Sequence, residues 1–283
     1  MRARFDQPIK IGPYHLREGF HGKAIYFGID IRTGQEVAMK EATPFDTNDG
    51  RDPIEVGKTC VEYEHSLQSR LRHPYISPAT LYRNKGNLYL VTPDYGRESL
   101  IRKNNSTMQE KLQTLEDIAY ALGHCHEQDI VHLDIKEENV MVRNGRGILI
   151  DFGAAREIGE PHPVTQAHIM CTEACAAPEY RLDGVYNTRT DSFSFSLMAY
   201  RTILNTEPFV IKGNRHILYD EPIHHPCELE DFGKLGELII KGLAIDPKSR
   251  PSVKRIAEAF TELHSKKDLQ PSEDSLALSP VSC

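Results

Sequence analysis

Residues 130–153 decide the fold. They read Ile-Val-His-Leu-Asp-Ile-Lys-Glu-Glu-Asn-Val-Met-Val-Arg-Asn-Gly-Arg-Gly-Ile-Leu-Ile-Asp-Phe-Gly. Two short apolar runs flank the Asn-Gly pair, and this pattern predicts a β-hairpin with a two-residue turn. Such a hairpin would bring Asp134, Asn139 and Asp151 to one point, with Lys136 beside them. Two carboxylates, an amide and an ammonium suit magnesium and a phosphate group better than a soft metal.

The pattern resembles the catalytic core of the eukaryotic protein kinase family. That family has a catalytic loop His-Arg-Asp-x-x-x-x-Asn and a metal-binding turn Asp-Phe-Gly. Here the loop carries Leu133 where the family has arginine, and the turn is unaltered. The resemblance extends over about residues 14–264. It implies an α+β fold with two lobes: a small N-terminal antiparallel β-sheet with one main helix, and a larger, mostly helical C-terminal lobe. The expected boundaries are 14–92 for the N-lobe, 93–98 for the hinge, 99–264 for the C-lobe and 265–283 for a disordered polar tail.

Composition excludes several other classes of protein. The 283 residues suffice for a sizeable core, and a net charge of -7 offers no basic surface for nucleic acid. No apolar run approaches the roughly 20 residues that cross a bilayer, and the first residues lack the apolar centre of a signal peptide. The six cysteines are scattered without zinc-site spacing, which favours free thiols in a reducing compartment, the cytosol or the nucleus. We expect a monomer that acts on a protein substrate, away from membranes and nucleic acids.

Residues 14–40 predict a strand, a glycine turn and two further strands that end at Lys40. Gly19 and Gly22 precede Val-Ala-Met-Lys, and the pairing resembles the kinase glycine-rich loop with its strand lysine. Arg17 stands where the family has its first glycine. The spacing after the glycines is one residue longer than usual, so either Ala24 or Ile25 takes the place of the family's valine. The resemblance assigns ATP binding to Leu16, Gly19, Gly22, Ala24, Ala38, Lys40, Thr92, Pro93, Tyr95 and Asp151.

A buried lysine needs a partner, and a helical pattern downstream supplies one. The family places its helix glutamate nine positions before the His-Pro that ends this segment, which selects Glu64 and leaves Glu62 as a surface acid. Further along, Thr92 corresponds to a small gatekeeper. The resemblance then places the adenine contacts at the carbonyl of Pro93 and the amide of Tyr95.

The carboxy-terminal part carries further family motifs. Thr172 is expected to hydrogen-bond Asp134 and Lys136, as in serine/threonine kinases. Glu179 of Ala-Pro-Glu is expected to pair with Arg250. The resemblance assigns catalysis to Lys40, Glu64, Asp134, Lys136, Asn139 and Thr172, and magnesium binding to Asn139 and Asp151.

These motifs predict a protein serine/threonine kinase that uses ATP and Mg²⁺. Because Leu133 removes the arginine that binds an activation-segment phosphate in the family, phosphorylation of Thr165 or Thr172 is expected to be dispensable. Two alternatives stay open. A pseudokinase that acts as a nucleotide-binding scaffold or allosteric regulator is favoured by Arg17 and opposed by the intact catalytic set. A small-molecule kinase of the aminoglycoside phosphotransferase type shares the loop but generally lacks Ala-Pro-Glu.

Overall fold

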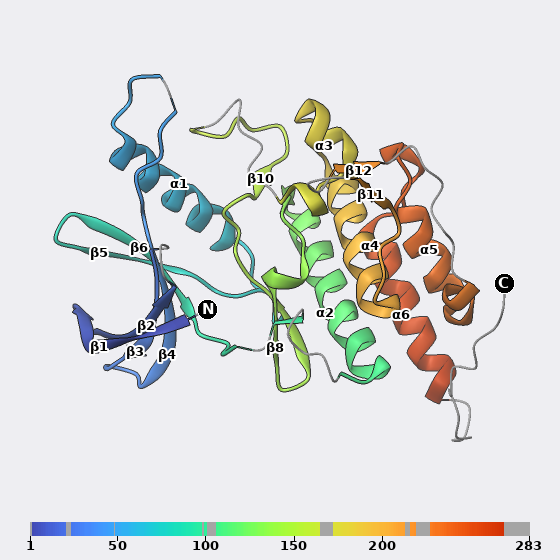
Figure 1. Ribbon diagram of the computed structural model, residues 1–283, viewed down its shortest axis with the longest axis horizontal. Helices are drawn as coiled ribbons and strands as arrows, with labels where there is room; N and C mark the ends of the chain where they lie inside the picture. The colour runs from blue at the N-terminus through green and yellow to red at the C-terminus, as the bar shows by residue number, and fades with distance from the viewer. Residues whose placement is uncertain are drawn as a thin grey trace.

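The computed structural model describes residues 2–20, 24–47, 49–97, 99–100, 106–164, 172–212, 216–218 and 227–268. An N-terminal lobe built on a β-sheet packs beside a larger lobe made mostly of helices, as predicted (Figure 1). Within the described part of the chain, no helix has both the length and the apolar character needed to cross a membrane.

The N-terminal sheet has six antiparallel strands in the order β1-β2-β3-β4-β6-β5. They are β1 (Arg2–Ile11), β2 (Tyr14–Phe20), β3 (Ile25–Asp30), β4 (Gln35–Glu41), β5 (Thr80–Asn84) and β6 (Asn87–Pro93). Alternate residues of the central strands face opposite sides of the sheet. Val37 and Met39 enter a buried cluster with Tyr14 and Leu16, whereas Ala38 and Lys40 face the other lobe.

Helix α1 (Pro53–Gln68) packs on this sheet and carries Glu64 on its buried side. Its start is fixed by Asp52, whose side chain accepts a hydrogen bond from the Ile54 N–H, and by a proline in the first turn.

The C-terminal lobe contains the remaining elements. Its helices are α2 (Met108–Glu127), α3 (Pro178–Asp183), α4 (Thr188–Leu204), α5 (Lys234–Gly242) and α6 (Val253–Asp268). Its short strands are β7 (Ile130–Val131), β8 (Val140–Arg143), β9 (Arg146–Leu149), β10 (Arg156–Glu157), β11 (Val210–Lys212) and β12 (His216–Leu218). Single 3-10 turns are η2 (Glu137–Asn139), η3 (Glu173–Cys175), η4 (Cys227–Phe232) and η5 (Pro247–Ser249).

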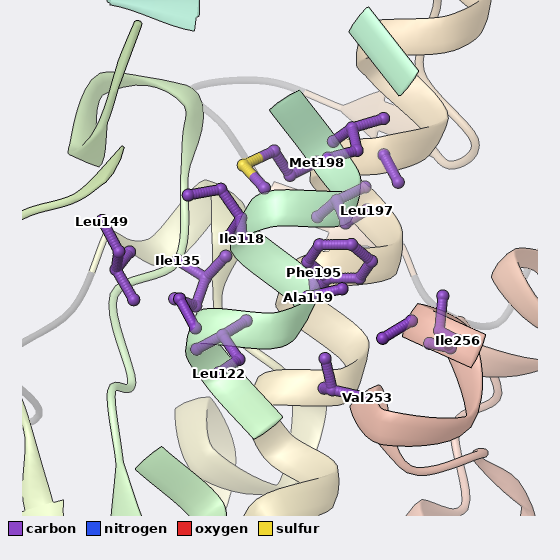
Figure 2. Packing of buried hydrophobic residues seen from close by; sticks show 14 of the residues in the cluster. Ile118, Ala119, Leu122, Ile135, Leu149, Phe195, Leu197, Met198, Val253 and Ile256 are labelled. Atoms are coloured by element: carbon purple, nitrogen blue, oxygen red, sulfur yellow. The ribbon is translucent and has the colours of Figure 1, made fainter. Parts of the chain in front are cut away.

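The core of this lobe lies between α2, α4 and α6 (Figure 2). Ile118 and Leu122 of α2 are fully buried, and Phe195 of α4 lies beside them. Ile135, just before the predicted hairpin, and Leu149, in its second strand, pack into the same cluster. The loop that contains Asp134 is therefore anchored in the hydrophobic core of this lobe.

The predicted hairpin is present as β8 and β9. Val140 pairs with Leu149 and Arg143 with Arg146, so the turn consists of two residues, Asn144 and Gly145. Both have positive φ angles of 53° and 75°, the geometry that an Asn-Gly turn favours.

Three sequence expectations need correction. Strand β1 precedes residue 14, so the sheet begins before the expected N-lobe boundary. Helix α6 runs to Asp268, four residues past the expected boundary at 264, and the rest of the expected tail lies outside the described residues. Gly19 lies within β2, paired with Ala3 and Tyr26, so the expected glycine turn does not begin there.

Candidate active site

Asp134, Lys136 and Asn139, three of the four side chains that the sequence pattern placed at one point, contact one another. Lys136 Nζ lies 2.5 Å from Asp134 Oδ2 and 2.6 Å from Thr172 Oγ1. Asn139 Nδ2 donates to the backbone oxygen of Asp134 at 2.8 Å and to its Oδ2 at 3.0 Å. The backbone N–H of Thr172 donates to Asp134 Oδ1 at 2.9 Å. Both carboxylate oxygens of Asp134 are thus oriented by fixed donors.

These contacts keep Asp134 ionised. Burial by itself would raise the pKa of its carboxyl, but the Lys136 ammonium and the hydrogen bonds from Thr172 outweigh burial and hold the pKa below its usual range. Asp134 can therefore accept a proton and a hydrogen bond at neutral pH, with its orientation set before a substrate arrives.

Lys40 reaches the same region from β4. Its Nζ lies 2.8 Å from Glu64 Oε2, as expected, and 3.2 Å from Asp151 Oδ1. Glu62 instead pairs with Arg83 at the surface, so the alternative partner is ruled out. The pKa of Asp151 is lowered to about 2, first by the charge of Lys40, whereas burial raises the pKa of Glu64. A single ammonium thus joins both lobes.

The backbone has an unusual conformation both in the 132–139 loop and at the start of the Asp-Phe-Gly turn. Leu133 and Asp151 have φ angles of 64° and 61°, which non-glycine residues rarely adopt. The buried carboxylate of Asp191 accepts the backbone N–H groups of His132 at 2.8 Å and Leu133 at 2.9 Å. His126 Nε2 lies 2.8 Å from the same carboxylate. Asp191 thereby fixes the loop from the first turn of α4.

A cavity of about 750 Å³ opens between the lobes in front of this cluster, a volume suited to a nucleotide-sized ligand. Its lining includes Lys40, Glu64, Asn139 and Asp151 at one end. The other end is lined by Ala38, Thr92, Pro93, Tyr95 and, on the C-lobe side, Met141. The cavity continues past Thr92 to Leu90 and Gln68, which is the open space expected behind a small gatekeeper.

The amino-acid sequence of the chain also matches known proteins. The family model described as the protein kinase domain matches residues 15–260. The chain belongs to the protein kinase family. This kinase domain is 24% identical over 89% of its length to CBL-interacting protein kinase 16 of Oryza sativa subsp. japonica. It is 25% identical over 82% of its length to the serine/threonine-protein kinase PknB of Mycobacterium leprae, and 23% identical over 83% to the calcium/calmodulin-dependent protein kinase cmkA of Emericella nidulans.

The aligned regions cover 57%, 39% and 61% of these three relatives, respectively. The kinase domain therefore matches only part of each relative. Family and fold follow from the match, whereas substrates and partners do not transfer with it.

Three of the expected nucleotide contacts need correction. Leu16 is fully buried in the cluster behind the sheet, and neither Gly19 nor Ala24 lines the cavity. Gly22 lies outside the described residues. Ile25 lines the cavity and pairs with Lys40. Of the two alternatives, Ile25 rather than Ala24 therefore takes the place of the family's valine.

Sequence reasoning also missed Phe27 and Met141, which line the cavity. Counting forward by two residues from Ile25, the register partner of Lys40, would have found Phe27, because every second residue of a strand shares a face.

The donor set fits magnesium. Because Asn139 Nδ2 is bound to Asp134, its side-chain oxygen is left as the atom available to a cation. Asp151 is ionised, and 47% of its side chain is exposed. No cluster of three or more His, Cys, Asp and Glu side chains occurs among the described residues. The protein therefore offers two oxygen ligands and no closed cage. Mg²⁺ in such a site takes its remaining ligands from water and phosphates.

Proposed function

We propose that this kinase domain transfers the γ-phosphoryl group of ATP to serine or threonine hydroxyls of proteins. The observation that carries the proposal is the Lys136 ammonium, which contacts both Asp134 and Thr172 and so orients the carboxylate. The named serine/threonine kinases among the relatives support the same class of acceptor.

Each side chain has a distinct task in this reaction. Asp134 accepts the proton of the attacking hydroxyl as the new oxygen–phosphorus bond forms and the bond to the ADP oxygen breaks. Lys136 lies close enough to Asp134 to neutralise charge on the transferred group. Lys40, which pairs with Glu64, would bind the α- and β-phosphates. Magnesium, bound by Asp151 and Asn139, would supply charge neutralisation at the phosphates. Catalysis would rest on positioning and electrostatics.

The direct test is Asp134→Asn, an isosteric change that removes the proton acceptor. Transfer from labelled ATP to a generic basic protein is expected to fall by a factor of roughly 100 or more. Asp129→Asn is the matched control, because Asp129 is exposed and five residues earlier in the chain. Undiminished transfer by Asp134→Asn, with the fold intact, would exclude this mechanism.

We further propose that activity does not require phosphorylation of the activation segment. Leu133 is buried in a small apolar cluster with Val131, Ala154 and Tyr180, so position 133 supplies no guanidinium to bind a phosphate. Arg51 donates to the carbonyl oxygen of Val164 at 2.9 Å. The described start of the segment is thus held by unmodified groups.

The test of this second proposal is Thr165→Ala; Thr165 itself lies outside the described residues. The variant and the phosphatase-treated protein are both expected to keep wild-type turnover. An inactive but folded Thr165→Ala would refute the proposal.

A pseudokinase is the competing proposal. It is favoured by Arg17, which is exposed at an irregularity in the pairing of β2 with β3. Thermal-shift measurements with ATP and magnesium, paired with a turnover assay, separate the two functions. A nucleotide-dependent shift without turnover would select the pseudokinase.

A further inference from the structure

Strand β1 carries an arginine into the nucleotide cavity. Arg2 pairs with Phe20 in the β1–β2 ladder, and both residues line the cavity. The guanidinium carbon of Arg2 lies 3.3 Å from the centroid of the Phe27 ring, a stacking distance. The side chain is 10% exposed. Arg2 is therefore an internal part of the cavity wall.

The same guanidinium forms hydrogen bonds with residues of the hinge. Arg2 Nη1 donates to Asp94 Oδ2 at 2.7 Å, and Nη2 donates to Asp94 Oδ1 at 2.8 Å. Nη2 also donates to the backbone oxygen of Gly96 at 2.7 Å. Bidentate pairing of this kind fixes both the position and the plane of a guanidinium. Asp94 lies between Pro93 and Tyr95, the residues whose backbone groups are expected to bind adenine.

The location of this contact conflicts with a bound nucleobase. Phe27, Ala38 and Thr92 are register partners on three neighbouring strands, and all three line the cavity as one row. A planar base that stacks under this row and reaches the hinge backbone needs the space beside Phe27 and Asp94. The guanidinium of Arg2 takes up part of that space.

A second contact ties β1 to the strand that leads into the glycine-rich turn. A methyl group built on Gly19 would meet the Phe5 ring at 2.8 Å, so β1 covers β2 closely at this point. Phe5 also packs against Tyr26, with 6.4 Å between ring centroids. Movement of Arg2 out of the cavity therefore involves movement of β1 away from β2.

We propose that Arg2 is an autoinhibitory latch, in which the N-terminal strand holds a guanidinium at the base end of the cavity and competes with the nucleobase of ATP. The inference rests on the proposed nucleotide site. Since only the unlatched state accepts the base, the apparent dissociation constant is the intrinsic one divided by the unlatched fraction. Displacement of β1 by a partner or by modification would then raise nucleotide affinity.

The test is the binding of ADP with magnesium, measured by titration calorimetry on the full chain. Arg2→Ala is expected to bind about tenfold more tightly than wild type, which corresponds to about 1.4 kcal/mol of lost latch contacts. Arg2→Lys is expected to fall between them, because an ammonium cannot pair with both oxygens of Asp94. Arg4→Ala is the matched control. Arg4 lies on the same strand, is 87% exposed and pairs with Glu18 at the surface, so the affinity of Arg4→Ala for ADP should equal that of wild type.

Thermal unfolding without nucleotide verifies that each variant is folded, and Arg2→Lys carries the test if Arg2→Ala is not. Unchanged or weaker binding by the folded Arg2 variants, with wild type binding, overturns the latch alone. No binding by wild type or by either variant overturns both the latch and the proposed kinase function.

Discussion

Replacing Arg250 should strongly lower the free energy of unfolding, although the change is not visible at the protein surface. Its side chain is fully buried, and all five of its N–H groups are used. Two pair with the carboxylate oxygens of Glu179, at 2.8 Å each. The other three donate to the backbone oxygens of Ala244, Arg189 and Ile245 at 2.7, 3.0 and 2.9 Å.

Arg250→Met keeps most of the volume but leaves a carboxylate and three carbonyls without these donors. Among the described residues, Thr190 Oγ1, at 3.0 Å, is then the remaining hydrogen-bond donor to the Glu179 carboxylate. Breaking one side of a buried ion pair costs about 3–5 kcal/mol. In a domain of this size, such a loss lowers the melting temperature by roughly 10 °C.

The assay is urea unfolding followed by far-UV circular dichroism for wild type, Arg250→Met, Glu179→Gln and the double variant. The two single changes should be strongly non-additive, with a coupling energy of about 1–3 kcal/mol. Arg255→Met, at an exposed position of α6, should change stability by less than about 0.5 kcal/mol. A loss below about 1 kcal/mol in Arg250→Met, or additive single effects, would refute the reasoning.

Four further outcomes are expected. Gly57→Ala would place a methyl group 1.8 Å from the carbonyl oxygen of Thr43, so α1 must shift and urea unfolding should show a loss of about 1–3 kcal/mol. Gly123→Ala meets no atom within 4 Å and should instead stabilise by about 0.5–1 kcal/mol; the reverse order of the two would contradict the packing. Glu64→Gln removes the charge that holds the strand lysine, so the Michaelis constant for ATP should rise in steady-state kinetics, and an unchanged constant would exclude that role. Burial lowers the pKa of His162 to about 4, so the unfolded chain binds more protons than the folded one between about pH 6.5 and 4, and stability falls as the pH falls through that window. His162→Gln should flatten this slope in urea midpoints, and a slope equal to wild type would show that the ring does not cause it.

The sequence predicted the parts of the site that depend on local spacing. The Asn-Gly hairpin fixes its own register, so the contact between Asp134 and Asn139, just before its first strand, followed from local spacing. The partner of Lys40 followed from a fixed offset on a helix that the hydrophobic pattern revealed. Both inferences depended on local features of the sequence, namely a two-residue turn and one face of a helix.

Long-range register was harder to predict. The position of Ala24 depended on how many residues the turn between β2 and β3 absorbs, and one extra residue moves every following side chain to the opposite face. Strand β1 was missed because half of residues 2–11 are polar and the segment includes a proline, which disfavours the interior of a strand. The role of Arg2 was hidden with it, because its partner Asp94 is 92 residues away.

The pairing of β1 along the edge of the sheet also bears on how the protein should be handled. A purification tag fused ahead of Arg2 would emerge beside the nucleotide cavity and could pull the guanidinium off Asp94. A tag fused after α6 would start from the opposite side of the larger lobe (Figure 1). Affinities for ADP measured with tags at these two positions should then differ. The size of the difference would report how stably β1 is packed against β2.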